Sequence, residues 1–167
     1  LSKRASQARD TKQKIPGVTT ALVIYLLSTI RLRRFRQTLA HRRAGRLVIT
    51  DRYPQVEVPG FYDGPGLSAA KAGSRFVAWL AQRERAKYEW MAGHLPTLVI
   101  RINIDIETAL ARKPDHARDL LEKKIAVTPV LTFAGAPIVE LDGREPFVTV
   151  KEKATAAIDA ALASSGA

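Results

Sequence analysis

Leu47-Val48-Ile49-Thr50-Asp51-Arg52-Tyr53-Pro54 is the stretch of sequence that most constrains the fold. Its apolar and β-branched residues predict a buried strand over 47–51 that ends in an acid, an arginine and an aromatic. Open α/β sheets bind ligands at the carboxyl ends of their strands. Arg52 can grip a phosphate there, and Asp51 can hold a metal-bound water or accept a proton. The alternative is a strand that runs into a solvated Asp-Arg turn.

Further elements alternate between strand and helix along the chain. The pattern predicts strands over 98–103 and 138–142 and helices over 19–44, 68–92, 106–113, 115–130 and 146–163. Ser68 and Asp105 are the expected N-caps of their helices. Such alternation predicts an α/β fold with a parallel sheet and helices on both faces. Trp79 and Trp90 are expected in the core or against a partner helix.

Composition limits the class of protein. The chain has 167 residues, of which 46% are hydrophobic, enough for one domain with a core; we expect this domain over 17–167. Residues 1–16 are basic and polar, and we expect them to be poorly ordered. There are no cysteines, which excludes disulfides, thiolate metal sites and a cysteine nucleophile, and fits a cytoplasmic protein.

The positive charge is concentrated at the start of the chain. Residues 1–46 hold 12 Lys/Arg and one acid, whereas residues 47–167 hold 15 of each sign. Such a charge attracts nucleic acid or another polyanion. No recognisable nucleic-acid module accompanies it, so we favour solvated and nucleotide-binding arginines over nucleic acid.

An apolar run over 17–30 raises the question of a membrane segment. It has 14 residues, and four arginines follow within six positions. Because a spanning helix needs about 20 apolar residues, the run predicts a buried amphipathic helix and no membrane partner.

Two motifs carry a resemblance to a known family. Asp51-Arg52-Tyr53 resembles the Asp-Arg-Tyr motif of thymidylate kinases, which belong to the P-loop nucleotide kinases. Residues 98–105, followed by the short helix to Arg112, are similar to the family's strand that ends in Asp and leads to a basic lid. The resemblance covers about residues 20–162. It implies a P-loop kinase-like fold and transfer of the γ-phosphoryl group of ATP, with Mg²⁺, to dTMP or a similar nucleotide.

The resemblance also implies roles for individual residues. Arg52 would hold the acceptor phosphate, and Asp51 would act through Mg²⁺, its water shell or that phosphate. Tyr53, Phe61 and Tyr62 are candidates to stack on the base, with Arg75 a further substrate-binding candidate. Arg112, Lys113 and Arg118 would form the lid, and Asp142, Gly143 and Arg144 would lie near the adenine.

Structural alternatives stay open for several of these residues. Phe61 can simply pack its loop, Asp115 can cap a helix after Pro114, and Asp142-Gly143 can be an ordinary turn. Asp63 before Gly64 is also expected in a turn.

The phosphate-binding loop of this class is missing. The sequence contains no Gly-Lys dipeptide, so it holds no Gly-x-x-x-x-Gly-Lys-[Ser/Thr] loop. We therefore expect an N-terminally incomplete kinase that is inactive as this chain alone, with an empty strand position in its sheet. The alternative is a non-catalytic P-loop-like module whose basic N-terminal region binds a polyanion or a partner. A kinase acting on a nucleoside or another small hydroxyl substrate is a third reading, and a homodimer is compatible with all three.

Overall fold

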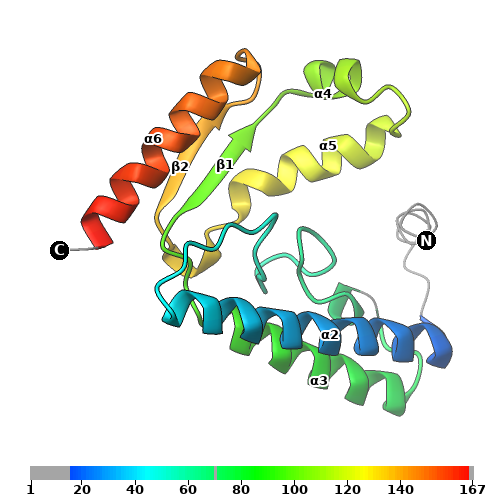
Figure 1. Ribbon diagram of the computed structural model, residues 1–167. Coiled ribbons are helices and arrows are strands. Elements are labelled where there is room, and N and C mark those ends of the chain that lie inside the picture. Colours follow the sequence, from blue (N-terminus) through cyan, green and yellow to red (C-terminus); the bar gives the residue numbers. More distant parts are fainter. Residues whose placement is uncertain (1–15, 70, 166–167) are drawn as a thin grey trace. The chain divides into compact units, whose positions relative to one another are not determined.

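The computed structural model describes residues 16–69 and 71–165 (Figure 1). The chain divides into two compact units, Leu1–His94 and Leu95–Ala167. The expectation of one domain over 17–167 stays a prediction. The expected basic segment lies, apart from Pro16, outside the described residues.

The first unit is built on two helices, α2 (Val18–Arg43) and α3 (Arg75–Ala92), with a short 3-10 turn η1 (Leu67–Ala69). The helices run parallel, because one buried cluster joins Ala21 to Val77 and Leu80. A second cluster, further along both helices, joins Phe35 and Leu39 to Tyr88 and Met91. A connection between parallel neighbours must cross back over their length, and residues 44–74 do so.

Two buried polar side chains order this connection. Gln55 is 1% exposed; its Nε2 donates to the carbonyl oxygens of Val58 (2.8 Å) and Phe61 (2.6 Å), and its Oε1 accepts from the Val58 N–H. Glu84 of α3 is also 1% exposed and accepts from the N–H groups of Gly66 (3.1 Å) and Leu67 (2.7 Å). Gln55 thus holds the backbone of the loop together, and Glu84 fastens the loop to α3.

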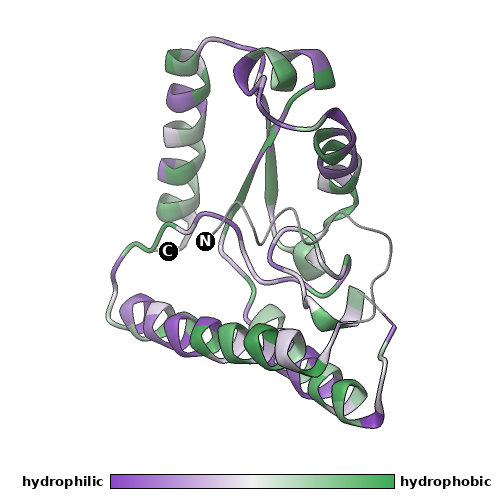
Figure 2. Cartoon of the chain, turned by 90° about the vertical axis from the view of Figure 1, so that its right-hand side faces the viewer, coloured by the Kyte–Doolittle hydropathy of each residue, from purple (hydrophilic) through white to green (hydrophobic). Residues whose placement is uncertain are grey.

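The second unit contains a small parallel sheet. Strands β1 (Val99–Asn103) and β2 (Ile138–Asp142) pair in register, from Val99 opposite Ile138 to Asn103 opposite Asp142. Between them come α4 (Ile106–Arg112), α5 (Arg118–Val127) and two 3-10 turns, η2 (Thr128–Val130) and η3 (Phe133–Gly135). Helix α6 (Phe147–Ser165) follows and packs along β2 (Figure 1). Hydrophobic and hydrophilic residues both occur along the helices of each unit (Figure 2).

The predicted strand over 47–51 is wrong. Residues 46–50 form no regular element, and the side chains of Leu47 and Ile49 are 60% and 76% exposed. A strand exists only with a hydrogen-bonded neighbour, and no described residue pairs with this segment. The described chain is therefore mostly helical with a two-stranded parallel sheet, and a P-loop kinase fold is not confirmed.

Most other boundaries agree with the sequence predictions. Strand 138–142 is confirmed, the helices over 19–44, 106–113 and 146–163 are confirmed within two residues, and Asp105 caps α4. The cap at Ser68 is wrong, because Ser68 lies in η1 and Ser74 caps α3 through a 3.2 Å bond from the Val77 N–H. Helix α5 is shorter than predicted; it gives way to η2 beside Pro129, which lacks the N–H that a helix requires.

Candidate functional site

Asp51 and Arg52 lie in an exposed bend beyond the end of α2. Because 47–51 is not a strand, the pair does not occupy the carboxyl end of a sheet strand as expected. No hydrogen bond or ion pair joins either side chain to another described residue. Arg52 has φ 73°, in the left-handed region that side chains other than glycine rarely adopt. An exposed acid and base with a strained backbone are thus available to a ligand.

Tyr53 is held by the protein itself. Its hydroxyl donates to the carbonyl oxygen of His94, and its ring meets that of Phe35 edge to face, with centroids 5.5 Å apart. Burial raises the pKa of Tyr53, and the charge of Arg42 partly opposes this rise. Stacking on a base would therefore use only the part of the ring that Phe35 leaves open, and this role stays a prediction.

Phe61, Tyr62 and Asp63 form a tight turn within the loop. Both aromatic residues are half-buried, and Tyr62 and Asp63 have positive φ values of 40° and 64°. The Asp63 carboxylate pairs with the guanidinium of Arg31 at 2.9 Å. The expected turn at Asp63 is confirmed, and its acid is fixed to α2.

Arg31 and Glu84 were not singled out by the sequence analysis. Arg31 pairs with Asp63 and also donates to the Tyr88 hydroxyl at 2.8 Å. Burial raises the pKa values of both Glu84 and Tyr88, and the charge of Arg31 opposes both rises. A signal existed for Glu84, because it stands between Leu80 and Tyr88 at helical spacing on an otherwise apolar side of α3. Together these groups position the loop that carries Phe61 and Tyr62.

Arg75 is the first residue of α3 and is exposed. Its side chain has no partner among the described residues, so its proposed role in substrate binding stays a prediction.

The three lid candidates gather at the junction of α4 and α5. Arg112 ends α4, Lys113 is its C-cap and Arg118 begins α5, all of them exposed. The Arg118 guanidinium donates to Glu107 at 2.5 Å and to Glu122 at 2.9 Å, and these bonds raise the pKa of Arg118. Asp115 does not cap α5, whose N-cap is Ala117. The junction therefore presents a cation that two carboxylates hold in place.

Polar groups also gather at the carboxyl ends of β1 and β2. Asp142 pairs with Arg144 at 2.7 Å, and hydrogen bonds from Arg144 lower the pKa of Asp142 to about 2. Gly143 donates to the carbonyl oxygen of Asn103 at 2.6 Å, which closes the turn against β1. Asp105 accepts from Thr108, and these bonds, helped by the charge of Arg144, lower its pKa. The expected Asp-Gly turn is confirmed; its contact with adenine stays a prediction.

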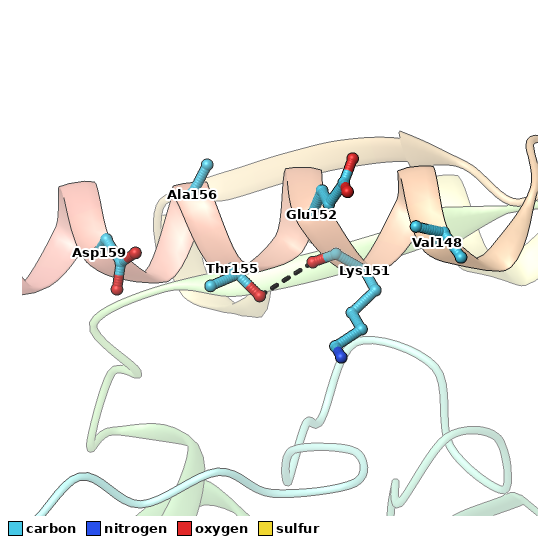
Figure 3. A pocket seen from close by; sticks show the side chains of 6 residues that line it. All are labelled: Val148, Lys151, Glu152, Thr155, Ala156 and Asp159. Atoms are coloured by element: carbon cyan, nitrogen blue, oxygen red, sulfur yellow. Dashed lines mark hydrogen bonds between the residues drawn. The ribbon is translucent and has the colours of Figure 1, made fainter.

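Two surface depressions of the described residues are lined by none of these candidate residues. One of about 370 Å³ is lined by side chains of α6: Val148, Lys151, Glu152, Thr155, Ala156 and Asp159 (Figure 3). It is shallow and open along one helix side, with Thr155 bonded back to the Lys151 carbonyl oxygen. It therefore gives no support to the predicted site.

Asp51 is the residue that the sequence analysis assigned to a metal ion, and this role stays a prediction. The described residues contain no group of three or more His, Asp or Glu side chains suited to a metal ion. Mg²⁺ in nucleotide sites is commonly held by one or two carboxylates and the substrate phosphates, so an exposed Asp51 fits that chemistry. In the described part of the chain, no helix has the length and apolar character needed to cross a membrane.

The chain belongs to the family of the Escherichia coli proteins YghS and YghR. It is 52% identical over 163 residues to the "uncharacterized ATP-binding protein YghS" of strain K12, a match over 97% of this chain and 69% of YghS. It is 40% identical over 159 residues to the "uncharacterized ATP-binding protein YghR" of the same strain, over 95% of this chain and 63% of YghR. The chain thus spans about two thirds of the length of these relatives. No family model matches it. No solved structure matches it significantly.

Proposed function

We propose that this chain is part of an ATP-dependent phosphotransferase that acts on a nucleotide, with a thymidylate kinase-like nucleoside monophosphate kinase as its specific activity. The names of YghS and YghR, which describe ATP-binding proteins, support the nucleotide donor. The Asp-Arg-Tyr sequence supports a phosphorylated acceptor. The reaction transfers the γ-phosphoryl group of ATP to the acceptor phosphate, giving ADP and a nucleoside diphosphate.

The proposal rests on the exposure of Asp51 and Arg52 and on the backbone geometry of Arg52. Both are exposed, neither is paired with a described residue, and Arg52 has a left-handed backbone. Unfavourable backbone geometry is concentrated at functional sites, where it aims a side chain at a ligand. A guanidinium that is free of protein carboxylates can bind phosphate oxygens in a bidentate manner.

The resemblance to thymidylate kinases gives the remaining candidate residues further roles in the reaction. The chain has no Gly-Lys phosphate loop, so we assign to it the acceptor side, the lid and the loop beside the adenine, and expect no activity from it alone. Asp51 would join the shell of Mg²⁺, which neutralises phosphate charge when it is bound. Tyr53, Phe61, Tyr62 and Arg75 would surround the acceptor; Arg112, Lys113 and Arg118 would close over the phosphates; Asp142, Gly143 and Arg144 would flank the adenine.

In this assignment the protein contributes positioning and charge. Arg52 would fix the acceptor phosphate in line with the donor, and the lid cations would stabilise the charge that spreads over the transferring oxygens. Glu107 and Glu122 hold Arg118 at the α4–α5 junction. Phosphate oxygens would compete with these carboxylates for the same guanidinium.

A kinase assay on the full-length protein that contains this chain tests the proposal. ADP formation is measured with ATP, Mg²⁺ and each of the common nucleoside monophosphates, for the unmodified protein and for Arg52→Ala. We expect Arg52→Ala to lower kcat/KM by roughly 100-fold, the scale seen when a charge-stabilising donor is removed. Arg34→Ala, at an exposed arginine of α2, is the matched control and should change little. Absence of transfer to every nucleoside monophosphate, or an unchanged Arg52→Ala variant, would contradict the assignment.

A further inference from the structure

Aromatic side chains of α3 are exposed on one side of the helix. Phe76, Trp79 and Trp90 are 45%, 46% and 41% exposed, so neither tryptophan lies in the core. The ring of Trp90 meets that of Phe35 on α2 edge to face, with centroids 6.3 Å apart, which is the contact with a partner helix that the sequence prediction also allowed. Phe76 stacks on Trp79 with ring centroids 6.0 Å apart, and the Arg83 guanidinium lies 5.2 Å from the centre of the Trp79 ring. Large aromatic groups at this exposure are typical of surfaces that meet a partner.

The neighbouring side of α2 continues this surface. Leu22 and Leu26 are 46% and 60% exposed, and Arg36, further along the helix, lies 5.2 Å from the centre of the Trp90 ring. Lys87 of α3 bridges the two helices, since its Nζ donates to Thr29 and lies 3.3 Å from the centre of the Tyr25 ring. We call this surface the α2–α3 face and define it by Leu22, Leu26, Arg36, Trp79, Arg83 and Trp90.

The α2–α3 face combines apolar and cationic side chains along both helices. Leucines and the Phe76–Trp79 pair lie near the starts of the parallel helices, and Arg36, Arg83 and Lys87 follow. No acidic residue occurs in α2. On α3, Glu84 is buried beneath the loop and Glu89 pairs with Arg85. A ligand that complements the face must therefore offer an apolar side flanked by negative charge.

This charge pattern argues against a second copy as the occupant. Residues 1–94 hold 18 Lys/Arg and 6 Asp/Glu, so two copies of the face would bring like charges together. Like charges placed opposite each other across an interface oppose association. The occupant that fits is a different molecule with carboxylates.

We propose that the α2–α3 face binds an acidic amphipathic helix of a partner protein. Parallel neighbouring helices leave a groove along their contact, and an amphipathic helix fits such a groove by its apolar side. Trp79 and Trp90 are eleven residues apart, about 16 Å or three helical turns along α3. Leucines of the partner helix contact Leu22, Leu26 and Trp79, and its carboxylates contact Arg36 and Arg83.

The test uses the full-length protein and a fluorescently labelled 21-residue helical peptide with leucines on one side and glutamates elsewhere. Fluorescence anisotropy gives Kd. We expect Trp79→Ala to weaken binding at least tenfold, and the double variant Arg36→Glu, Arg83→Glu to do so as well. A peptide with lysines in place of the glutamates should recover binding to the double variant. Arg34→Glu, at an α2 arginine outside the defined face, is the matched control and should retain most of the affinity.

Several results would overturn this proposal. They are absence of peptide binding, Kd values that the face variants leave unchanged, and failure of the lysine peptide to bind the charge-reversed protein. Circular dichroism of each variant must match the unmodified protein. Protection of Trp79 and Trp90 from acrylamide quenching in the free protein, or a dimer in sedimentation that Trp79→Ala dissociates, would show that the face is already covered. Tighter binding to phosphatidylglycerol vesicles or to oligo(dT) than to the acidic peptide would assign the face to another class of ligand.

Discussion

Glu84 is a buried acid whose two hydrogen bonds fasten the loop at Gly66 and Leu67. A Gln side chain has only one acceptor oxygen, so Glu84→Gln leaves one of the two N–H groups without its partner. We expect Glu84→Gln to lower the free energy of unfolding by about 1–3 kcal/mol, the cost of leaving one buried N–H group without an acceptor. Urea denaturation near pH 7 measures the change. Glu89→Gln, on the exposed side of α3, should cost less than about 0.5 kcal/mol, and equal losses for the two variants would contradict this account.

Glu84 also makes the stability of the folded protein depend on pH, with lower stability expected as pH rises. Burial raises the pKa of Glu84 above the unfolded value near 4.5, so the folded state binds more protons than the unfolded state in this range. The stability that proton binding at Glu84 adds is fully present below the unfolded pKa and is lost as pH rises through the folded pKa. We expect the unmodified protein to lose stability over that interval relative to Glu84→Gln. Denaturation series at several pH values test this, and a difference that is constant with pH would contradict it.

Gly143 is required by close packing at the end of the sheet. A Cβ atom at this position would lie 2.8 Å from the Asn103 carbonyl oxygen and 2.9 Å from Cγ2 of Ile102. We expect Gly143→Ala to destabilise the second unit by about 1–3 kcal/mol through this overlap. Gly93→Ala is the control, because its Cβ would make only ordinary contacts of 3.5 Å at a helical φ of −67°. Hydrogen exchange of the β1 and β2 amides would report the difference.

At the scale of elements, the sequence alone does not show which of two serines, Ser68 or Ser74, caps the N-terminus of α3. Ser74 caps the helix through Val77, whereas Ser68 lies in η1. We expect Ser74→Ala to cost about 0.5–2 kcal/mol, as for other N-cap replacements, and Ser68→Ala to cost less. Thermal unfolding of the two variants measures this. A larger effect at Ser68 would mean that the helix begins earlier.

Local patterns were sufficient for the elements whose signals are local. Asp105 caps α4 through short-range chemistry, and the apolar runs of β1 and β2 form strands because each pairs with the other. The segment 47–51 has the same composition as those strands but no partner among the described residues, and pairing is a long-range property. The same dependence on long-range contacts limits what the sequence predicts about the candidate site. Asp51 and Arg52 were found by their types, whereas the bonds of Tyr53 to His94 and of Arg31 to Asp63 depend on segments distant in the sequence.

At the scale of the whole molecule, the two units provide separate readouts of folding. Both tryptophans of the 167-residue chain, Trp79 and Trp90, belong to the unit that ends at His94. Tryptophan fluorescence therefore follows the first unit, whereas exchange of the β1 and β2 amides follows the second. Because each unit has its own compact set of contacts, we expect Gly143→Ala to lower β-strand protection without moving the fluorescence midpoint.

Ser74→Ala is the reciprocal variant, since it weakens α3 in the first unit. It should lower the fluorescence midpoint and leave strand protection unchanged. If each variant instead moves both signals by the same free energy, the chain unfolds as one cooperative unit, which is the behaviour that the sequence analysis expects of a single domain over 17–167. The pair of variants thus decides between one folding unit and two, because each substitution acts on one unit and each signal reports one unit.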